Sequence, residues 1–310
     1  MRCALIYNPV SGRNRNTRVA EINRIAEALA AEGHNVEIIS TVGPGSAANL
    51  ARKAATASAD IIFACGGDGT VHEVLQGLVS ETGTPSCSLG IVPMGSANAL
   101  ARHLRLSLDS VTAALQQLHG TTCVIPVGKV ICSSTVRYYT VMAGAGPDGV
   151  LVYSLLAQDK SRLGRLAYYL HAARLFATHR FSPFQVDFKL FASGTPGSCK
   201  AVSVIATRVD SLGGLFSGLT NSCASIRHTA MHLHILRPPA FLSLPLWFLS
   251  GWLRMPRLNP YLQGLRVDSF SCLPLAGSEP HVEADGEWLG RLPMQVSLIP
   301  NALRILLPHS

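Results

Sequence analysis

The first 120 residues alternate short apolar runs with segments whose apolar residues recur every three or four positions. The apolar runs are typical of buried strands, and the recurrent spacing is typical of amphipathic helices. The expected strands are Cys3–Tyr7, Val36–Ser40, Ile61–Cys65 and Leu89–Val92. The expected helices are Thr17–Ala31, Ser46–Ala57 with Ser46 as its cap, Val71–Val79 and about Ser96–Leu104. This alternation predicts parallel strands joined by crossover helices.

After Thr121 the pattern changes to short strand-like runs separated by Gly, Pro, Ser and polar turns, which favours antiparallel sheets. One helical pattern, about Gly164–His179, interrupts them. We therefore expect an α/β N-terminal domain over residues 1–120. A mainly antiparallel β-sandwich domain should follow over 121–310, with a boundary uncertain by about ten residues.

Composition excludes a disordered chain, since 48% of the residues are hydrophobic and only 14% are charged. The eight cysteines are scattered along the 310 residues with no C-x-x-C pair. We expect them to be reduced core residues rather than disulfide partners or zinc ligands.

The net charge of +8 is unevenly distributed. Residues 211–267 contain five arginines and no Asp or Glu, and they include the 16-residue uncharged stretch Pro238–Leu253. That stretch is short for a membrane span, and its prolines make a continuous helix unfavourable. A buried helix or a subunit contact would also explain it.

We expect a cytoplasmic protein that contacts an anionic membrane surface through about residues 238–257. The N-terminal apolar run is too short for a signal peptide. Nucleic acid is a less favoured partner, because the arginines do not cluster with stacking aromatics. The oligomeric state is left open, a dimer included.

The strongest chemical pattern follows the third expected strand. Gly66, Gly67 and Gly69 surround Asp68, and a helix is expected to begin at once. Glycines let the backbone approach a bulky anion, and the first amides of a helix point toward it. Asp68 is either a turn residue or a residue beside a metal-chelated phosphate. Glu73, three residues after Thr70, is either part of a capping box or a ligand residue.

Two further loops follow expected strands. One carries Gly95, Ser96 and Asn98, and the other carries Asn8, Ser11 and Gly12. Each is an ordinary turn or cap by itself. Three such loops at the carboxyl ends of parallel strands form the expected ligand crevice of an open α/β sheet.

Two acidic motifs lie in the second half. Asp285-Gly286-Glu287 reads as a hairpin turn from its residues alone. Asp148 lies in the small-residue loop Ala143–Gly149, where it is either a turn residue or a secondary site residue.

Taken together, these motifs resemble the catalytic domain of diacylglycerol kinases, in particular the soluble bacterial lipid kinases that also resemble sphingosine and ceramide kinases. The resemblance covers nearly the whole chain. It rests on Asn8-Pro9-x-Ser11-Gly12, Gly66-Gly67-Asp68-Gly69-Thr70-x-x-Glu73, Pro93-x-Gly95-Ser96-Ala97-Asn98-x-x-Ala101-Arg102, Gly164–Tyr169 and Asp285-Gly286-Glu287. The Gly-Gly-Asp-Gly-Thr part is shared with NAD kinases and bacterial 6-phosphofructokinases.

The resemblance implies an ATP- and Mg²⁺-dependent kinase that phosphorylates a hydroxyl of diacylglycerol or a related lipid. Glu287 would accept the proton of the lipid hydroxyl, and Asp68 would lie near the phosphates and magnesium. The implied ATP-binding residues are Asn8, Ser11, Gly12, Thr41, Gly66, Gly67, Asp68, Gly69, Thr70, Glu73, Gly95, Ser96, Asn98 and Asp285. An NAD kinase and a non-catalytic lipid-binding regulator on the same fold are the alternatives.

Two segments depart from the family pattern. Arg227 and His228 stand where the family has acids that help to hold a structural magnesium ion, so we expect that metal site to be absent. The usual Asn-x-x-x-x-Gly-Gly-Gly stretch is altered over Thr207–Gly214, which leaves the lipid specificity open.

Overall fold

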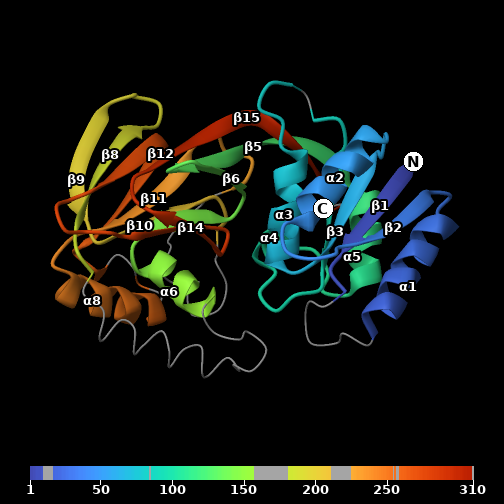
Figure 1. The fold of residues 1–310 in the computed structure, drawn as a ribbon, viewed down its shortest axis with the longest axis horizontal. Coiled ribbons are helices and arrows are strands. Elements are labelled where there is room, and N and C mark those ends of the chain that lie inside the picture. Colours follow the sequence, from blue (N-terminus) through green and yellow to red (C-terminus); the bar gives the residue numbers. More distant parts are fainter. Residues whose placement is uncertain are drawn as a thin grey trace. The chain divides into compact units, whose positions relative to one another are not determined.

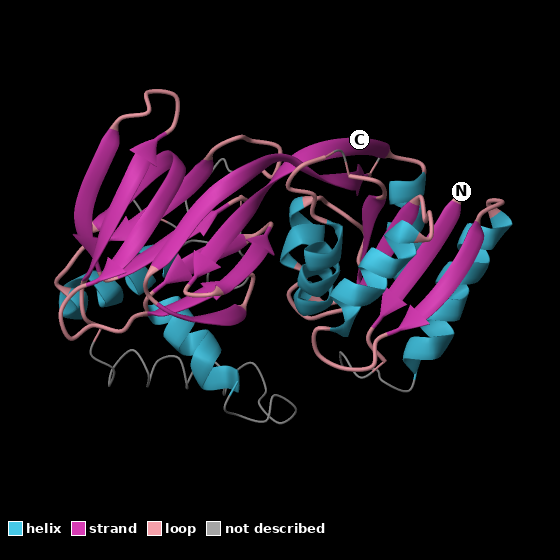
Figure 2. Cartoon of the chain, turned by 45° about the horizontal axis from the view of Figure 1, so that its top comes forward, coloured by secondary structure: helices cyan, strands magenta, loops and turns pink. Residues whose placement is uncertain are grey.

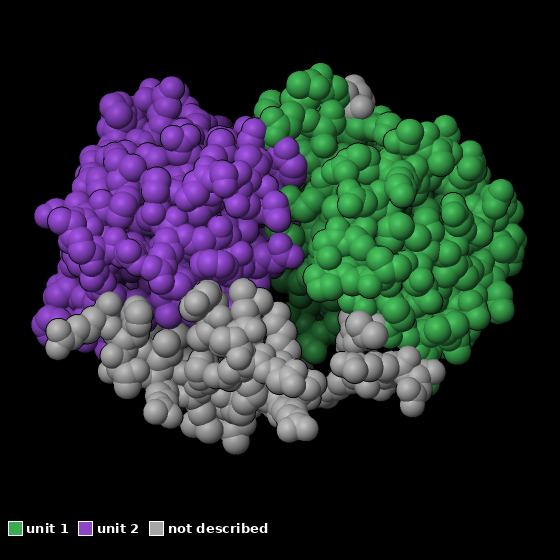
Figure 3. All heavy atoms as spheres, viewed as in Figure 1, with its two compact units in different colours: residues 1–127, 299–310 green, residues 128–298 purple. Residues whose placement is uncertain are grey.

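A computed structural model describes residues 1–9, 17–83, 85–156, 181–210, 225–253, 255 and 258–308. The chain divides into two compact units (Figure 3). Unit 1 comprises residues 1–127 and 299–310, and unit 2 comprises residues 128–298. Each is described by itself.

Unit 1 contains a parallel sheet in the order β2-β1-β3-β4, and the end of β15 adds a further parallel strand beside β4 (Figure 1). Its elements are β1 (Arg2–Tyr7), α1 (Arg18–Ala31), β2 (Asn35–Ser40), α2 (Ser46–Thr56), β3 (Ile61–Gly66), α3 (Asp68–Leu78), β4 (Ser88–Pro93), α4 (Ala99–His103) and α5 (Ser110–Leu118).

The alternation of side chains along a strand explains why helices cover both faces of this sheet. Cys3, Leu5 and Tyr7 of β1 pack in one cluster with α1 and α5. On α2 and α3, Ala48 and Gly77 lie so close that a Cβ on Gly77 would overlap the Ala48 carbonyl oxygen. All residues of β3 and β4 are buried, as expected of central parallel strands.

Unit 2 is built mainly from antiparallel strands, which Figure 2 draws as magenta arrows. Their order is β14-β13-β7-β10-β11-β12, and β8 and the first residues of β15 also pair with β12. Its elements are β6 (Thr135–Tyr139), β7 (Met142–Ala145), α6 (Pro147–Leu156), β8 (Phe184–Leu190), β9 (Pro196–Ala201), β10 (Ser203–Thr207), β11 (Met231–Leu236), α8 (Ala240–Trp252), β12 (Leu262–Pro274), β13 (His281–Ala284) and β14 (Glu287–Arg291). The predicted α/β first half and antiparallel second half are confirmed.

Two strands continue from one unit into the other: β5 (Thr121–Cys132) and β15 (Met294–Leu307). Within unit 1, Arg304 and Ile305 of β15 pair with Ser88 and Leu89 of β4. The first unit therefore extends beyond residue 120 and includes residues 299–310, which the sequence pattern placed in the second domain. The strands β4 and β15 lie some 200 residues apart in the sequence, so no local pattern of residues predicts that they pair.

The proline-containing stretch is helical, contrary to expectation. Helix α8 runs through Pro245. On the inner side of this helix, Leu244 and Trp247 pack against Val202, Ile205 and Leu236. Burial of these side chains outweighs the loss of one backbone hydrogen bond at the proline.

Within the described ranges, no helix is both long and apolar enough to cross a membrane. The seven cysteines with a described position are all free, and five of them are buried. The predicted helix Gly164–His179 lies outside the described residues.

Candidate active site

The loops that follow β3 and β4 touch through their backbones. An added Cβ on Gly67 would lie 3.2 Å from the Gly95 Cα, and one on Gly95 would overlap the Gly67 Cα. The Met94 amide donates to the Gly66 carbonyl at 2.8 Å. Both positions require glycine, because a larger residue would push the two backbones apart and break this contact.

Asp68 joins the same two loops through its side chain. Its Oδ2 accepts the Asn98 amide at 2.8 Å, and its Oδ1 accepts the Ala99 amide at 2.7 Å. The carboxylate thus satisfies two donors where α4 begins, and negative charge is favourable there. Asp68 is at once the first residue of α3 and the residue that anchors α4.

The two helices begin at different residues from those predicted. Helix α3 begins at Asp68 rather than Val71, so its first amides lie directly in the glycine loop. Helix α4 begins at Ala99 rather than near Ser96, and Ser96 is an exposed loop residue. Asn98, at a φ of 49°, stands before α4.

The side chain of Asn98 also closes its own loop. Its Oδ1 accepts the Gly95 amide at 3.0 Å and its Nδ2 donates to the Gly95 carbonyl at 2.9 Å. Asparagine tolerates the left-handed backbone conformation better than most residues do. The sequence pattern predicted a simple helix start here and did not indicate this conformation.

The described contact of Glu73 is not the expected capping box. Its Oε2 accepts the Ala47 amide at 3.2 Å, in the first turn of α2. Ser46 is likewise not the cap of α2: its Oγ accepts the Val42 and Gly43 amides and donates to the Gly43 carbonyl. A glutamate from the neighbouring helix α3 thus supplies an acceptor to the start of α2.

The remaining predicted residues of unit 1 lie near the end of β1 or outside the described ranges. The Thr41 amide donates to the Tyr7 carbonyl at 2.9 Å, so buried Thr41 adjoins the strand end that leads to Asn8. Thr70 is buried in the first turn of α3, and its methyl and hydroxyl fill the space that the absent Cβ of Gly66 leaves. Ser11 and Gly12 are not among the described residues.

Sequence reasoning missed Arg18. This arginine is buried at the start of α1, and its Nη2 donates to the Met94 carbonyl at 3.3 Å, beneath the second glycine loop. Its Nη1 lies 3.5 Å from Glu21. A signal was present: Arg18 falls on the same helical stripe as Ile22, Ile25 and Leu29, where an arginine is unusual.

In unit 2, Asp285 and Gly286 form the turn between β13 and β14, with φ angles of 47° and 81°. The hairpin expected from the residues is therefore present. Asp285 also has a second role, because its carboxylate accepts three backbone amides, those of Thr140, Val141 and Met142, each at 2.9 Å. The carboxylate fixes the turn to the connection between β6 and β7.

This arrangement places Glu287 at the start of β14, partly exposed and immediately after a rigid turn. On the other side of the turn, buried Glu283 accepts the Gly286 amide through Oε2 at 2.9 Å. The turn is thus held by the carboxylates of Glu283 and Asp285, and Glu287 follows it as a third, partly exposed acid.

Arg208 is a further residue that the sequence did not single out. It is fully buried at the end of β10, and it donates to the Ile226 carbonyl at 2.5 Å and to the His228 carbonyl at 3.5 Å. Burial lowers the pKa of Arg208 to about 10, while the charge of Asp285 opposes that shift. Arg208 remains protonated at neutral pH.

The family that the chain resembles holds a structural magnesium ion, and the contacts of Arg208 show whether the loop at 225–230 fits such an ion. Magnesium needs oxygen ligands, but here a guanidinium group already occupies two of the loop's carbonyl oxygens. The side chains of Arg227 and His228 are exposed and bring no negative charge. The residues present do not fit a metal ion at this loop.

Asp148 lies at the start of α6, where both of its oxygens are buried. Burial raises its pKa to about 7, and the nearby amides of residues 148 and 149 offset the rise in part. A Cβ on Gly144 would overlap the Asp148 carboxylate, so the glycine makes room for it.

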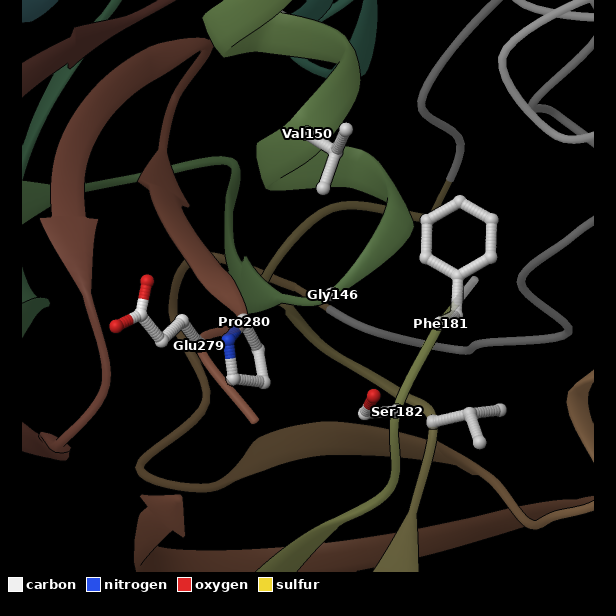
Figure 4. Close-up of a pocket in the computed structure, with 7 residues that line it drawn as sticks. Gly146, Val150, Phe181, Ser182, Glu279 and Pro280 are labelled. Carbon is white, nitrogen blue, oxygen red and sulfur yellow. The ribbon is translucent and has the colours of Figure 1, made fainter. Parts of the chain in front are cut away.

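A small pocket opens beside the loop that carries Asp148 (Figure 4). Its volume is about 50 Å³, and it is lined by Gly146, Val150, Phe181, Ser182, Val202, Glu279 and Pro280. This volume is far below the several hundred Å³ of a typical ligand pocket, so it does not hold a diacylglycerol as it stands.

The structure therefore brings the predicted residues together in two groups. In unit 1, Gly66, Gly67, Asp68, Gly95 and Asn98 form one locked pair of loops at the ends of β3 and β4. In unit 2, Asp285 and Glu287 share one hairpin.

Comparison with known proteins covers the segment of the chain that carries the first of these groups. Residues 2–130 match the family model of the diacylglycerol kinase catalytic domain. The chain carries a diacylglycerol kinase catalytic domain. This domain includes β1 to β4 and both glycine loops.

Curated relatives extend the likeness beyond that domain. The chain is 29% identical to the diacylglycerol kinase of Bacillus subtilis (strain 168) over 216 residues, which cover 69% of this chain and 67% of that protein. It is 32% identical to a diacylglycerol kinase of Staphylococcus epidermidis (strain ATCC 12228) over 187 residues, which cover 60% of this chain and 57% of that one. The matched segment thus spans between about half and two thirds of these relatives.

Solved structures show the same fold. A structure from Bacillus anthracis str. Sterne, provisionally named a diacylglycerol kinase, superposes with a TM-score of 0.77 at 22% identity, covering 99% of this chain and 95% of that one. A yeast NADH kinase, solved in complex with NADH, gives a TM-score of 0.52 at 10% identity, covering 99% and 83%.

Proposed function

We propose that this chain is an ATP-dependent lipid kinase that transfers the γ-phosphate to a hydroxyl of diacylglycerol or a related lipid. One observation carries the proposal. Within a diacylglycerol kinase catalytic domain, two glycine loops are held in backbone contact at the ends of neighbouring parallel strands, where the first turn of α3 also lies. That arrangement suits a polyphosphate.

Phosphoryl transfer depends mainly on positioning and charge neutralisation. We assign the amides of the Gly66–Thr70 loop, together with Thr41 and Ser96, to contacts with the ATP phosphates. Magnesium would arrive with ATP as part of the substrate, because no cluster of three metal-ligating side chains occurs among the described residues. Arg18, beneath the second loop, adds a fixed positive charge.

Glu287 is the group we assign to the acceptor. Its carboxylate takes the proton of the lipid hydroxyl as that oxygen bonds to the γ-phosphorus and the bond to the β-phosphate oxygen breaks, so that ADP leaves. Asp285 and Glu283 hold the hairpin that presents it.

The substrate also implies a location. Diacylglycerol resides in membranes, and no described helix can span one. We therefore propose a cytoplasmic enzyme that associates peripherally with the bilayer.

The proposal is tested by incubating the chain with γ-labelled ATP and a panel of acceptors in mixed micelles, then separating the products by thin-layer chromatography. The panel contains diacylglycerol, sphingosine, ceramide and NAD, with and without EDTA. We expect label in a phospholipid, and only with Mg²⁺ present. Label in NAD would identify an NAD kinase, and no label in any acceptor would support the non-catalytic regulator.

The role of Glu287 is tested with Glu287→Gln, which preserves shape and removes the charge. We expect kcat to fall by at least about 100-fold, as for loss of a general base. Glu27→Gln, on the exposed face of α1, is the matched control and should retain full activity. Wild-type kcat for Glu287→Gln would refute the assignment.

A further inference from the structure

Helix α8 carries its polar and apolar residues on the opposite sides from those of an ordinary surface helix. Its two serines, Ser243 and Ser250, are buried. The exposed positions carry large apolar side chains, including Phe241 at 76%, Leu242 at 42% and Leu249 at 49% exposure. A helix facing water has the reverse arrangement, because exposed leucine and phenylalanine gain nothing there.

The inner side of α8 is fully committed to unit 2. Leu244 and Trp247 pack on β10 and β11, and the Asn259 side chain donates to the Ser243 carbonyl at 3.3 Å. The Ser250 hydroxyl is satisfied within the helix, because it donates to the Trp247 carbonyl at 3.0 Å. Rotating the helix to hide its leucines would break the contacts of Leu244, Trp247 and Ser243, so the outward apolar face is a fixed property of the fold.

This face continues past the end of the helix. Leu253, Met255 and Leu258 are also exposed. We call the exposed side chains of Phe241, Leu242, Leu246, Leu249, Leu253, Met255 and Leu258 the α8 face.

The charge beside this face selects its partner. Residues 211–267 contain no acidic residue, and Arg237, three residues before the start of α8, is exposed. A second copy of this chain would bring the same positive charge, whereas an anionic bilayer offers both an apolar interior and a negative surface.

The inner side of α8 reaches the loop that carries Asp148. Phe181 and Val202 pack in the same cluster as Leu244 and Trp247, and both line the small pocket beside that loop (Figure 4). A bilayer seated on the α8 face would therefore be separated from this pocket by α8 and the side chains beneath it.

We propose that the α8 face inserts into the surface of an anionic phospholipid bilayer, with α8 lying in the membrane plane. The proposal extends the proposed lipid-kinase function to its membrane surface. It rests on that function only for the role of the membrane as the source of the acceptor lipid. Membrane binding itself can be measured without any kinase assay.

The test is co-sedimentation of the full chain with vesicles of phosphatidylcholine mixed with phosphatidylglycerol. In the test variant, Leu242→Gln and Leu249→Gln are combined. In the matched control, Leu108→Gln and Ile38→Gln are combined, at 56% and 41% exposure. Both residues belong to unit 1, whereas α8 belongs to unit 2.

We expect the test variant to lower the vesicle partition coefficient at least about tenfold, since two leucines lose their apolar burial. The control should bind like the wild type, and both variants should keep the wild-type melting temperature. Omitting phosphatidylglycerol or raising the salt concentration should weaken wild-type binding.

Unchanged vesicle binding in the test variant would overturn the proposal. So would a test variant that changes the oligomeric mass in sedimentation equilibrium, because the face would then be covered by a second copy. Binding that ignores phosphatidylglycerol would overturn its anionic part. Turnover of a short-chain, water-dispersed diacylglycerol separates the two proposals: its absence in the wild type refutes the kinase, whereas its retention in a test variant that no longer binds vesicles supports both.

Discussion

The two glycine loops of unit 1 and the acidic hairpin of unit 2 hold their acidic residues in different ways. In unit 1, glycines let two backbones touch, and Asp68 completes a contact that sterics already enforce. In unit 2, the turn involves no such close approach, since nothing lies within 4 Å of the position that a Cβ on Gly286 would take. There Asp285 holds the turn through three hydrogen bonds of its own. Substitutions in the first group should therefore affect catalysis most, and those in the second should affect stability most.

The largest expected effect is that of Asp285→Gly. Glycine keeps the positive φ of the turn but removes three charge-assisted hydrogen bonds, so we expect a loss of about 4 kcal/mol in the free energy of unfolding. Urea denaturation followed by circular dichroism measures it. Asp60→Gly is the control, because Asp60 accepts one amide, that of Arg2, and should cost about 1 kcal/mol. Equal costs would remove the distinction between the two regions.

Next in size is Gly95→Ala. The new Cβ would overlap Gly67 and push the loops apart, so we expect kcat/KM to fall about 100-fold, as for misplacement by about 1 Å. Gly264→Ala, in β12, is the control, because nothing lies within 4 Å of its Cβ position and it belongs to neither glycine loop. If both variants lose activity equally, the close approach is not what the activity depends on.

Asp148 gives a smaller effect that depends on pH. Its pKa is raised to about 7 in the folded chain from 3.8, so its protonated form is favoured there, and its contribution to stability is lost as the pH rises toward and past 7. Asp148→Asn removes this loss. We expect the variant's gain in unfolding free energy to be on the order of 2 kcal/mol larger at pH 8 than at pH 5. A gain independent of pH would show that Asp148 is not protonated in the folded state.

The smallest expected effect is that of Glu73→Gln. If Glu73 serves mainly the start of α2, the variant should lose about 0.5–1 kcal/mol of stability and keep its affinity for ATP, measured by calorimetry. Lost ATP affinity at unchanged stability would instead make Glu73 the nucleotide contact that the family resemblance implies.

Local patterns were sufficient for much of the fold. The apolar runs that became β3 and β4 and the change of periodicity after Thr121 predicted both fold classes, because each depends on neighbouring residues only. The Asp285–Gly286 turn was equally visible, since few residues other than glycine, asparagine and aspartate adopt its positive φ angles. The glycine loop was visible because three glycines surround Asp68 in the sequence.

Other features depend on contacts between distant residues and could not be predicted in this way. Arg208 meets the carbonyls of Ile226 and His228 only after β10 and β11 have paired. The helical state of α8 depends on burial of Leu244 and Trp247, which outweighs the propensity of Pro245. Arg18 is the exception, because its place on an apolar stripe was present in the sequence.

The return of β15 to unit 1 has a consequence for how the first sheet resists aggregation. Arg304 and Ile305 pair with Ser88 and Leu89, so β15 covers the edge of the strand that leads to the second glycine loop. Without this segment, β4 would expose unpaired backbone groups that invite pairing with other chains. A segment distant in the sequence thus protects an edge of the sheet that carries both glycine loops.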